Sequence, residues 1–386
     1  MAKYIVTTVN TAGTITAMNS YSGTQLLYTD AAFLVWLWTD PHAANINTVI
    51  ATINVGVTPA GMAITPDSHY AYVANNNNYG VPCEDNVSVL NLHHNTLHTT
   101  INDGSFNQPY TITMNADGSK AYVTNSNSTT ITIIDTDNNT VIGVIGGFDG
   151  PSGMVITPDG TTAYVNNYGG PEGVGSGNGT TVRIVDLNAN SIIGQPITVG
   201  LAPAALAITP DGNYVYVANY VDGNPGTGTI SIIQTSNNTV VGTINGLFGP
   251  FAIKITPNGK YAYVTNFGSN NFAPIGTTLS IIKLRNNSII KTITLGIQPS
   301  GLAITPDGHY AYVSNYNTLY SDGQNFTGLT AGQGTVNIID IHEKKLKHIT
   351  IPVDQSPDAI VISPNGKYAY VSNYTSNTVN VIAIPQ

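Results

Sequence analysis

The sequence predicts an all-β fold, a β-propeller of four-stranded antiparallel blades. A phrase of about sixteen residues recurs seven times: Pro-x-x-hydrophobic-x-hydrophobic-(Thr/Ser)-Pro-(Asp/Asn)-Gly, then a strand ending Ala-Tyr-Val-x-Asn. Its copies are 42 to 58 residues apart, with their Tyr-Val pairs at Tyr72, Tyr122, Tyr164, Tyr216, Tyr263, Tyr312 and Tyr370. A period of this length with strand patterns and no helical periodicity is typical of a radial array of small sheets.

The copy that begins at Pro299 predicts the elements of one blade in order. Apolar and small residues alternate over 300–305 and predict the innermost strand, A. Pro306-Asp307-Gly308 predicts a tight turn, because proline presets φ, aspartate bonds its own backbone and glycine accepts positive φ. Tyrosine and valine favour strand B over 309–315. Strand C is expected at 335–341 and strand D at 346–353, which makes four strands per repeat.

These motifs resemble the YVTN family of β-propeller repeats. The matching phrases include ITPDGNYVYVANY at 208–220, ITPNGKYAYVTNF at 255–267 and DNNTVIGVI at 137–145. The resemblance covers residues 45 to 386 and implies a cell-surface or surface-layer protein. Similar propellers include lactonases, lyases and quinone-dependent dehydrogenases. Their dedicated histidine, glutamate or metal sets have no match that can be placed here, so no catalytic residue is carried over.

The number of blades depends on the N-terminal region. The last repeat supplies strands A, B and C and then stops, while residues 1–57 contain about five strand patterns. The favoured interpretation has eight blades: 13–56 forms a degenerate blade, and strand 3–9 completes the last one. The alternative has seven blades closed by strand 47–55, with 1–44 as an appendage. The favoured scheme gives a single domain, 1–386, in which 1–57 supply the degenerate blade and closing strand and 58–386 the seven repeats.

The charge composition excludes some partners. The chain has 12 Lys and Arg against 21 Asp and Glu, a net charge of −9, and no basic cluster. Binding to nucleic acid or to an anionic membrane surface requires positive charge, so we expect neither, and no membrane insertion. No secretory signal or membrane-span pattern is visible, and the single Cys83 excludes an intrachain disulfide. The uncharged polar composition favours an extracellular or particle-surface location.

Binding is expected on the face that carries the long, Gly-rich B–C loops, at 75–86, 166–180, 219–229, 266–277 and 314–335. Each Tyr-Val pair is followed by asparagine, and in five copies an aromatic residue comes next. The predicted binding residues are Asn167, Asn219, Asn266, Asn315 and Asn373 with Tyr168, Tyr220, Phe267, Tyr316 and Tyr374. Amides pair with hydroxyls and rings stack on sugars, so a glycan or a protein is the expected partner. The alternative is that the amides bond their own loops and the rings pack between blades.

Catalytic and metal-binding signatures are weak. Most aspartates fall in turns, where turn chemistry explains them, and the loop carboxylates Glu84, Asp85, Glu172, Asp222 and Asp322 lack calcium-loop spacing. No nucleophile elbow, zinc motif or phosphate-binding loop is present. We therefore expect no cofactor, no metal and no catalytic residue.

Three functions follow. The first is a non-catalytic binding or surface protein that contacts protein or glycan through the long-loop face, with self-association kept open. The second is a structural subunit of a surface layer or particle coat. The third is a propeller hydrolase or lyase with a site at the mouth of the central channel, where two or more of the loop carboxylates would meet.

Overall fold

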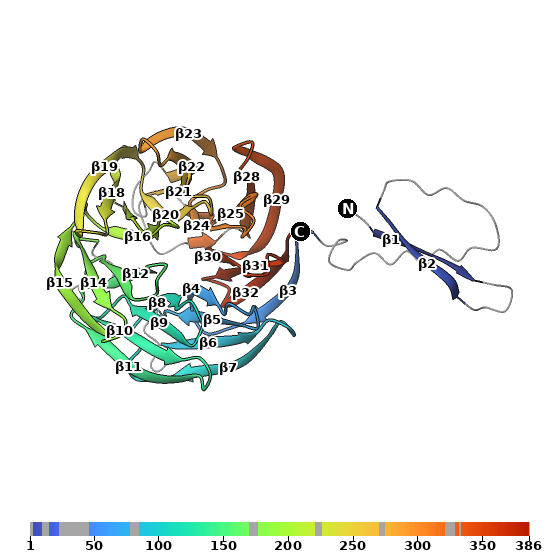
Figure 1. Ribbon diagram of the computed structural model, residues 1–386, viewed down its shortest axis with the longest axis horizontal. Helices are drawn as coiled ribbons and strands as arrows, with labels where there is room; N and C mark the ends of the chain where they lie inside the picture. Colours follow the sequence, from blue (N-terminus) through green and yellow to red (C-terminus); the bar gives the residue numbers. More distant parts are fainter. Residues whose placement is uncertain are drawn as a thin grey trace.

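The structure is a ring of seven blades around one axis (Figure 1). This computed structural model describes residues 3–9, 15–22, 46–77, 85–169, 177–220, 226–269, 275–320, 329–331 and 333–385. Each blade is a four-stranded antiparallel sheet, as the repeat predicts. Within the described ranges, no helix has the length and apolarity needed to cross a bilayer.

Successive strands of the chain form each blade from the axis outwards. Blade 1 contains β4 (Pro59–Ile64), β5 (Tyr70–Asn75), β6 (Asn86–Asn91) and β7 (Thr96–Asn102). Blade 2 contains β8 (Pro109–Met114), β9 (Lys120–Asn125), β10 (Thr130–Asp135) and β11 (Thr140–Gly146). Blade 3 contains β12 (Pro151–Ile156), β13 (Thr162–Asn167), β14 (Thr181–Asp186) and β15 (Ser191–Thr198). Blade 4 contains β16 (Pro203–Ile208), β17 (Tyr214–Asn219), β18 (Gly228–Gln234) and β19 (Thr239–Leu247).

The last three blades follow the same order. Blade 5 contains β20 (Pro250–Ile255), β21 (Tyr261–Gly268), β22 (Ile275–Lys283) and β23 (Ser288–Thr294). Blade 6 contains β24 (Pro299–Ile304), β25 (Tyr310–Asn315), β28 (Gln333–Asp340) and β29 (Lys345–Gln355), with a small sheet of β26 (Thr318–Tyr320) and β27 (Leu329–Ala331) in its B–C loop. Blade 7 contains β30 (Pro357–Ile362), β31 (Tyr368–Asn373), β32 (Thr378–Ala383) and β3 (Thr48–Asn54).

The favoured eight-blade ring is wrong, and the seven-blade alternative agrees with the structure. An N-terminal strand does complete the last blade, but it is β3, which pairs with β32 from Thr48↔Ala383 to Asn54↔Thr378. The strand expected to close the ring, β1 (Lys3–Val9), pairs instead with β2 (Ile15–Ser22) in a hairpin outside the ring (Figure 1). Seven repeats therefore need only one additional strand. The other strands expected in the degenerate blade, 24–29 and 32–38, lie outside the described residues.

The Pro-Asp-Gly turns form as the sequence predicts. In blade 4, Oδ1 of Asp211 accepts hydrogen bonds from the Thr209 hydroxyl at 2.5 Å and the Asn213 backbone N–H at 3.0 Å. Gly212 has a φ of 74°, a left-handed conformation that glycine adopts without strain. These hydrogen bonds hold the pKa of Asp211 below its usual value. The turn aspartates therefore have a structural role.

The repeated tyrosines join each blade to the next. All seven are at most 2% exposed, and their rings lie in the apolar layers between blades. Four hydroxyls donate to the Oδ1 of the asparagine that directly precedes strand D of the following blade, namely Tyr72 to Asn139, Tyr164 to Asn238, Tyr216 to Asn287 and Tyr312 to Asn47. Each of these asparagines has a positive φ, which asparagine tolerates better than most residues. The tyrosine of the Tyr-Val motif and the asparagine before strand D thus form a hydrogen bond that connects neighbouring blades.

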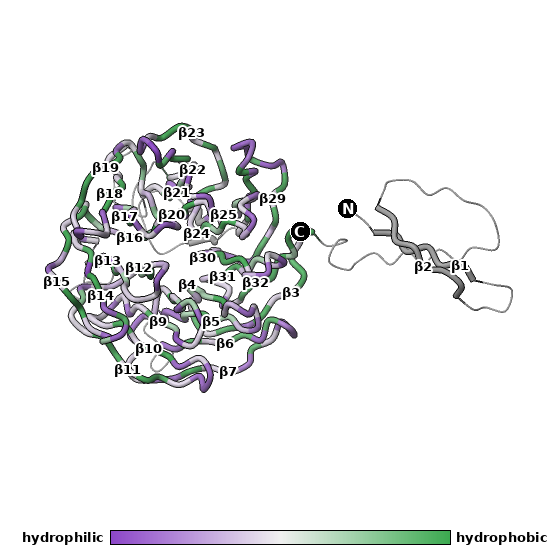
Figure 2. The backbone as a smooth tube through the Cα atoms, viewed as in Figure 1, coloured by the Kyte–Doolittle hydropathy of each residue, from purple (hydrophilic) through white to green (hydrophobic). Residues whose placement is uncertain are grey.

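Apolar packing continues all the way round the ring. Between blades 4 and 5, for example, Tyr216 and Ile232 pack with Ile253 and Ala262 in one buried cluster. Another cluster joins blade 7 to blade 1 and includes Met62, Val73, Tyr370 and Val381. Figure 2 shows hydrophobic residues in the blades on every side of the ring. The ring is therefore a rigid support for the loops and side chains at its axis.

Candidate functional site

The predicted asparagines lie at the roots of the B–C loops, with their side chains buried. Asn219, which is 0% exposed, donates from Nδ2 to Oγ1 of Thr229 and Oγ of Ser231, both at 3.0 Å. The Nδ2 groups of the other four bond strand C of their own blades in the same way, at Asn167, Asn266, Asn315 and Asn373. Each amide fixes the end of strand B to strand C, so the donor groups are already used within the blade.

The predicted aromatic residues, in contrast, meet one another. Ring centroids are 6.3 Å apart for Tyr220 and Phe267, 6.2 Å for Phe267 and Tyr316, and 6.3 Å for Tyr316 and Tyr374. Most of these pairs are tilted or edge-to-face, the arrangement that aromatic quadrupoles favour. Tyr168 packs against the same apolar group. The five side chains come from blades 3 to 7, so the residue after the repeated asparagine follows the ring around its axis.

Phe251 joins this group and was missed from the sequence. Its ring lies 5.1 Å from that of Phe267 and 6.1 Å from that of Tyr220. It directly follows the first proline of its repeat, on the innermost strand β20. Pro250 pairs with Asn266, which places Phe251 at the loop-bearing end of the ring.

The position occupied by Phe251 has equivalents in all seven blades. Four equivalents are small, namely Ala60, Ser152, Ala204 and Ser300, whereas the other two are Tyr110 and Asp358. Tyr110, Phe251 and Asp358 are therefore the three exceptions to a repeat position near the axis that is otherwise alanine or serine. A comparison of this one repeat position could have found them in the sequence.

Asp358 is a half-buried carboxyl near the axis. Its backbone is fixed between blades 6 and 7, because the Ser300 hydroxyl donates to the Pro357 carbonyl at 2.7 Å and the Ser314 hydroxyl to the Asp358 carbonyl at 3.4 Å. Burial raises the pKa of Asp358 to about 7. The side chain remains partly accessible, so surrounding protein rather than complete enclosure removes its water.

Tyr110 has Asp358 and the phenols of three other blades among its neighbours. Its pKa is raised well above the usual value by burial, then by the negative charge of Asp358 and the neighbouring phenols of Tyr168, Tyr374 and Tyr316. These residues belong to blades 2, 3, 6 and 7. We call the whole group the axial cluster; its members are Tyr110, Tyr168, Tyr220, Phe251, Phe267, Tyr316, Asp358 and Tyr374.

The loop carboxylates do not extend this group in the described part of the chain. Asp85 accepts a hydrogen bond from the Gln108 backbone N–H at 3.1 Å, and burial raises its pKa. Glu84, Glu172, Asp222 and Asp322 lie outside the described residues. Across the described ranges, no three His, Cys, Asp or Glu side chains are grouped so that they could hold a metal ion.

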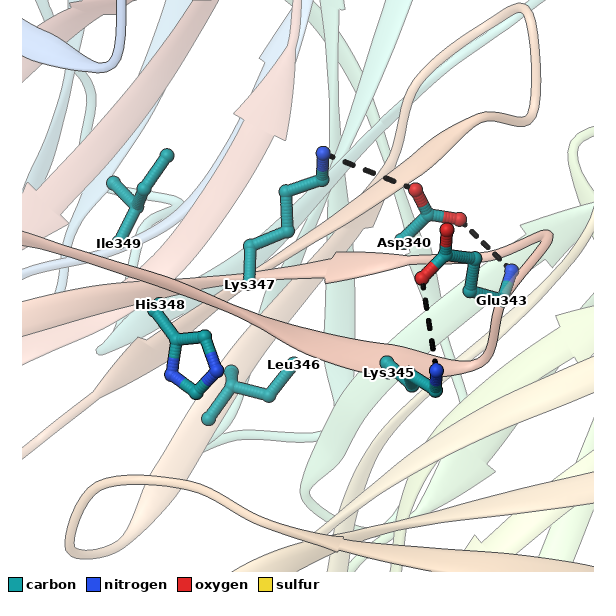
Figure 3. A pocket seen from close by; sticks show the side chains of 7 residues that line it. All are labelled: Asp340, Glu343, Lys345, Leu346, Lys347, His348 and Ile349. Carbon is teal, nitrogen blue, oxygen red and sulfur yellow. Dashed lines mark hydrogen bonds and ion pairs between the residues drawn. The ribbon is translucent and has the colours of Figure 1, made fainter.

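A shallow depression of about 350 Å³ lies elsewhere, beside the β28–β29 turn (Figure 3). Lys347 lies 3.9 Å from Asp340, and Lys345 lies 4.0 Å from Glu343. Exposed ion pairs of this kind contribute little, because water screens them and long side chains lose freedom. The depression is open, and its lysines already pair with its carboxylates, so it lacks the enclosure of a ligand site.

Comparisons with known proteins support the propeller. A family model described as "Lactonase, 7-bladed beta-propeller" matches residues 239–386, less than half of the chain. The solved structure of Kuenenia stuttgartiensis hydrazine synthase has a TM-score of 0.69 and 21% identity, covering 85% of this chain and 96% of that one. This likeness shows the fold alone.

One curated relative is similar over a short segment. The PE-PGRS family protein PE_PGRS18 of Mycobacterium tuberculosis is 45% identical over 60 residues, 16% of this chain. The segment spans 13% of the length of that relative. The chain is thus a β-propeller repeat protein, similar to these proteins in its repeats.

Proposed function

We propose that the protein is a binding propeller whose contact surface is the partly exposed side of the axial cluster, with a glycan or a protein segment as its ligand. Tyr220 and Phe267, which are 2% and 5% exposed, support this surface from below. The observation that carries the proposal is the continuous series of ring contacts from Tyr220 through Phe251, Phe267 and Tyr316 to Tyr374. Phe251, Tyr316 and Tyr374 are only partly buried, so they offer ring surface to solvent. Partly exposed aromatic groups on a rigid support are typical of binding surfaces.

The buried asparagines support this surface. Their amides hold the start of each B–C loop against strand C, and the aromatic residue follows directly in the chain. The rings are therefore positioned before any ligand arrives, which lowers the entropic cost of binding. The binding role proposed from the sequence thus falls on the aromatic residues, with the asparagines positioning them.

The test is calorimetry of the full chain against linear cello-, chito-, xylo- and malto-oligosaccharides and a peptide library. We expect at least one ligand to bind, and Tyr316→Ala to weaken it at least about tenfold, as for a central aromatic contact. Tyr310→Ala is the matched control, because Tyr310 is also partly buried but lies at the other end of the same strand. No binding in the whole panel, or equal binding by both variants, would contradict the proposal.

A second candidate is hydrolysis of a cyclic ester, favoured by the lactonase family match, which includes Asp358. A carboxyl with a pKa near 7 can exchange protons at neutral pH. Asp358 would take a proton from water as that water adds to the ester carbonyl. The ring C–O bond would then break, and the proton would pass to the leaving oxygen to give a hydroxy acid.

The hydrolase is tested by following acid release from γ-butyrolactone and δ-valerolactone at constant pH. The expected rate rises as the pH passes about 7, because Asp358 must be ionised to accept a proton. Asp358→Asn should abolish the acid release. A variant as active as the original chain would exclude Asp358 as the base.

A further inference from the structure

We propose that the axial cluster binds an organic ammonium ion, held between the carboxylate of Asp358 and the faces of the surrounding tyrosine rings. The inference rests on the proposed binding function and names the ligand class for the same surface.

The aromatic part of this site has the composition that cations favour. Tyr316 and Tyr374 stand 6.3 Å apart with their planes tilted by 51°. Tyr110 and Asp358 directly follow Pro109 and Pro357, which pair with Asn125 and Asn373, so both side chains start at the loop-bearing end of the ring, where Tyr374 also lies. A ring face carries negative charge density, and several rings around one point attract a quaternary or protonated amine.

The carboxylate lacks a cationic partner among the described residues. The seven innermost strands carry only two charged residues, Asp358 and Lys254. Lys254 lies toward the opposite end of β20, and its pKa is lowered by burial alone, without an electrostatic contribution from Asp358. A half-buried carboxylate without a counter-ion is costly, and a bound cation would remove that cost.

This arrangement discriminates between ligand charges. An anion would be repelled by Asp358. A neutral ligand, an oligosaccharide included, would gain from contact with the rings but nothing from the carboxylate, so it should bind more weakly than a cation. A cation is the only class that gains from both the rings and the carboxylate.

The pH dependence follows from the groups that face Asp358. The phenol of Tyr110 interacts with the charge of Asp358 and stays neutral because its pKa is raised, and the phenols of Tyr168, Tyr316 and Tyr374 lie near Tyr110. Asp354, near the end of β29, already accepts hydrogen bonds from Thr378 and Asn380. Ammonium binding should therefore weaken as the pH falls below about 7, the pKa of Asp358.

The experiment is calorimetry of the full chain with choline, with its uncharged isostere 3,3-dimethylbutan-1-ol, and with n-butylammonium, at constant ionic strength. We expect choline to bind at about pH 9 and about 100-fold more weakly at about pH 5, two units below the pKa. The isostere should bind at least about tenfold more weakly than choline at the higher pH. Comparison of butylammonium with choline shows which ligand is preferred. Tighter binding of butylammonium would indicate a primary amine such as a lysine side chain, and tighter binding of choline would indicate a quaternary ammonium ion.

Asp358→Asn is the matched variant, because it keeps the side-chain shape and removes the charge. It should weaken choline binding at about pH 9 and abolish its pH dependence, while a thermal melt confirms that the variant is folded. Equal binding of choline and its isostere would overturn the cation assignment and leave the aromatic surface intact. Absence of binding by both amines would overturn the inference. The proposed binding function is tested separately by calorimetry with the oligosaccharides and the peptide library.

Discussion

The hydroxyl of Tyr312 donates to Oδ1 of Asn47 at 2.9 Å, across a separation of 265 residues. This bond joins blade 6 to the turn that precedes β3, so it lies where the two distant parts of the chain close the ring. Deletion of residues 1–55 removes β3 and this bond, and we expect the variant to lose cooperative unfolding. Deletion of residues 1–45 keeps both, and its melting temperature should stay within a few degrees of the full chain.

Thermal denaturation of the two truncations checks this prediction. In the eight-blade scheme strand 3–9 completes the last blade, so that scheme predicts a large loss of stability when residues 1–9 alone are removed. A large loss of stability on deletion of residues 1–45 would favour closure by strand 3–9 and would contradict closure by β3.

Lys344 occupies the turn position that asparagine holds elsewhere. It has a φ of 53°, and the buried Tyr263 hydroxyl, which would meet an asparagine there, has no hydrogen-bond partner. Lys344→Asn should raise the free energy of unfolding by about 1–2 kcal/mol, because it pairs the hydroxyl and relieves the backbone. The loss of the Lys344 ammonium, 4.4 Å from the Tyr261 ring centroid, opposes this gain.

Chemical denaturation of Lys344→Asn and Lys344→Gly separates the two causes. Glycine relieves the backbone but offers no acceptor to Tyr263. If both variants gain equally, the hydrogen bond contributes nothing.

Asp358 should make the ring less stable as the pH rises. Its folded pKa of about 7 lies above its unfolded value of 3.8, so the folded state binds the proton more tightly. The free energy of unfolding should therefore fall between about pH 4 and pH 7, by at most about 4 kcal/mol, and level off above that range. Asp85, whose pKa burial also raises, contributes in the same direction.

Comparison with Asp358→Asn isolates the contribution of Asp358. This variant should be more stable than the original chain at about pH 8, with a flatter profile between pH 4 and pH 7. Identical profiles would show that Asp358 is as well solvated in the folded state as in the unfolded chain.

Substitutions of the neighbouring residues Asn315 and Tyr316 should affect different properties, the first the free energy of unfolding and the second ligand affinity. Asn315→Ala removes the bonds from Nδ2 to Oγ1 of Thr335 and Oδ1 of Asn337, both 3.0 Å, and should cost about 1–3 kcal/mol in unfolding free energy. Tyr316→Ala should mainly weaken ligand binding. Urea titration and calorimetry on both variants check this; loss of binding without loss of stability in Asn315→Ala would make the amide a ligand contact.

The repeat predicts the blades because each copy carries its own turn and strand chemistry. Thr209, Asp211 and Gly212 form the expected turn from local hydrogen bonds alone. The number of blades depends instead on which N-terminal strand reaches β32, and strands 3–9 and 47–55 were both plausible from their patterns. Local pattern does not specify a partner more than 300 residues away.

The candidate site was predicted in part for a similar reason. The aromatic residues after the asparagines stood out because they share a position in the repeat. Tyr110, Phe251 and Asp358 were missed because they interrupt a repeat position that is small in the other four blades. The hydrogen bond between the repeated tyrosine and the next blade was also not predicted, because the sequence does not indicate which turn the tyrosine hydroxyl contacts.

The closure by β3 also has a consequence for synthesis. The strand leaves the ribosome long before its partner β32, which ends at Ala383. Throughout that interval the uncharged segment Thr48–Asn54 has a backbone edge without its native partner. Such an edge invites pairing with a neighbouring nascent chain. Cells that make this protein at high density would therefore need to shield this segment until β32 has been synthesised.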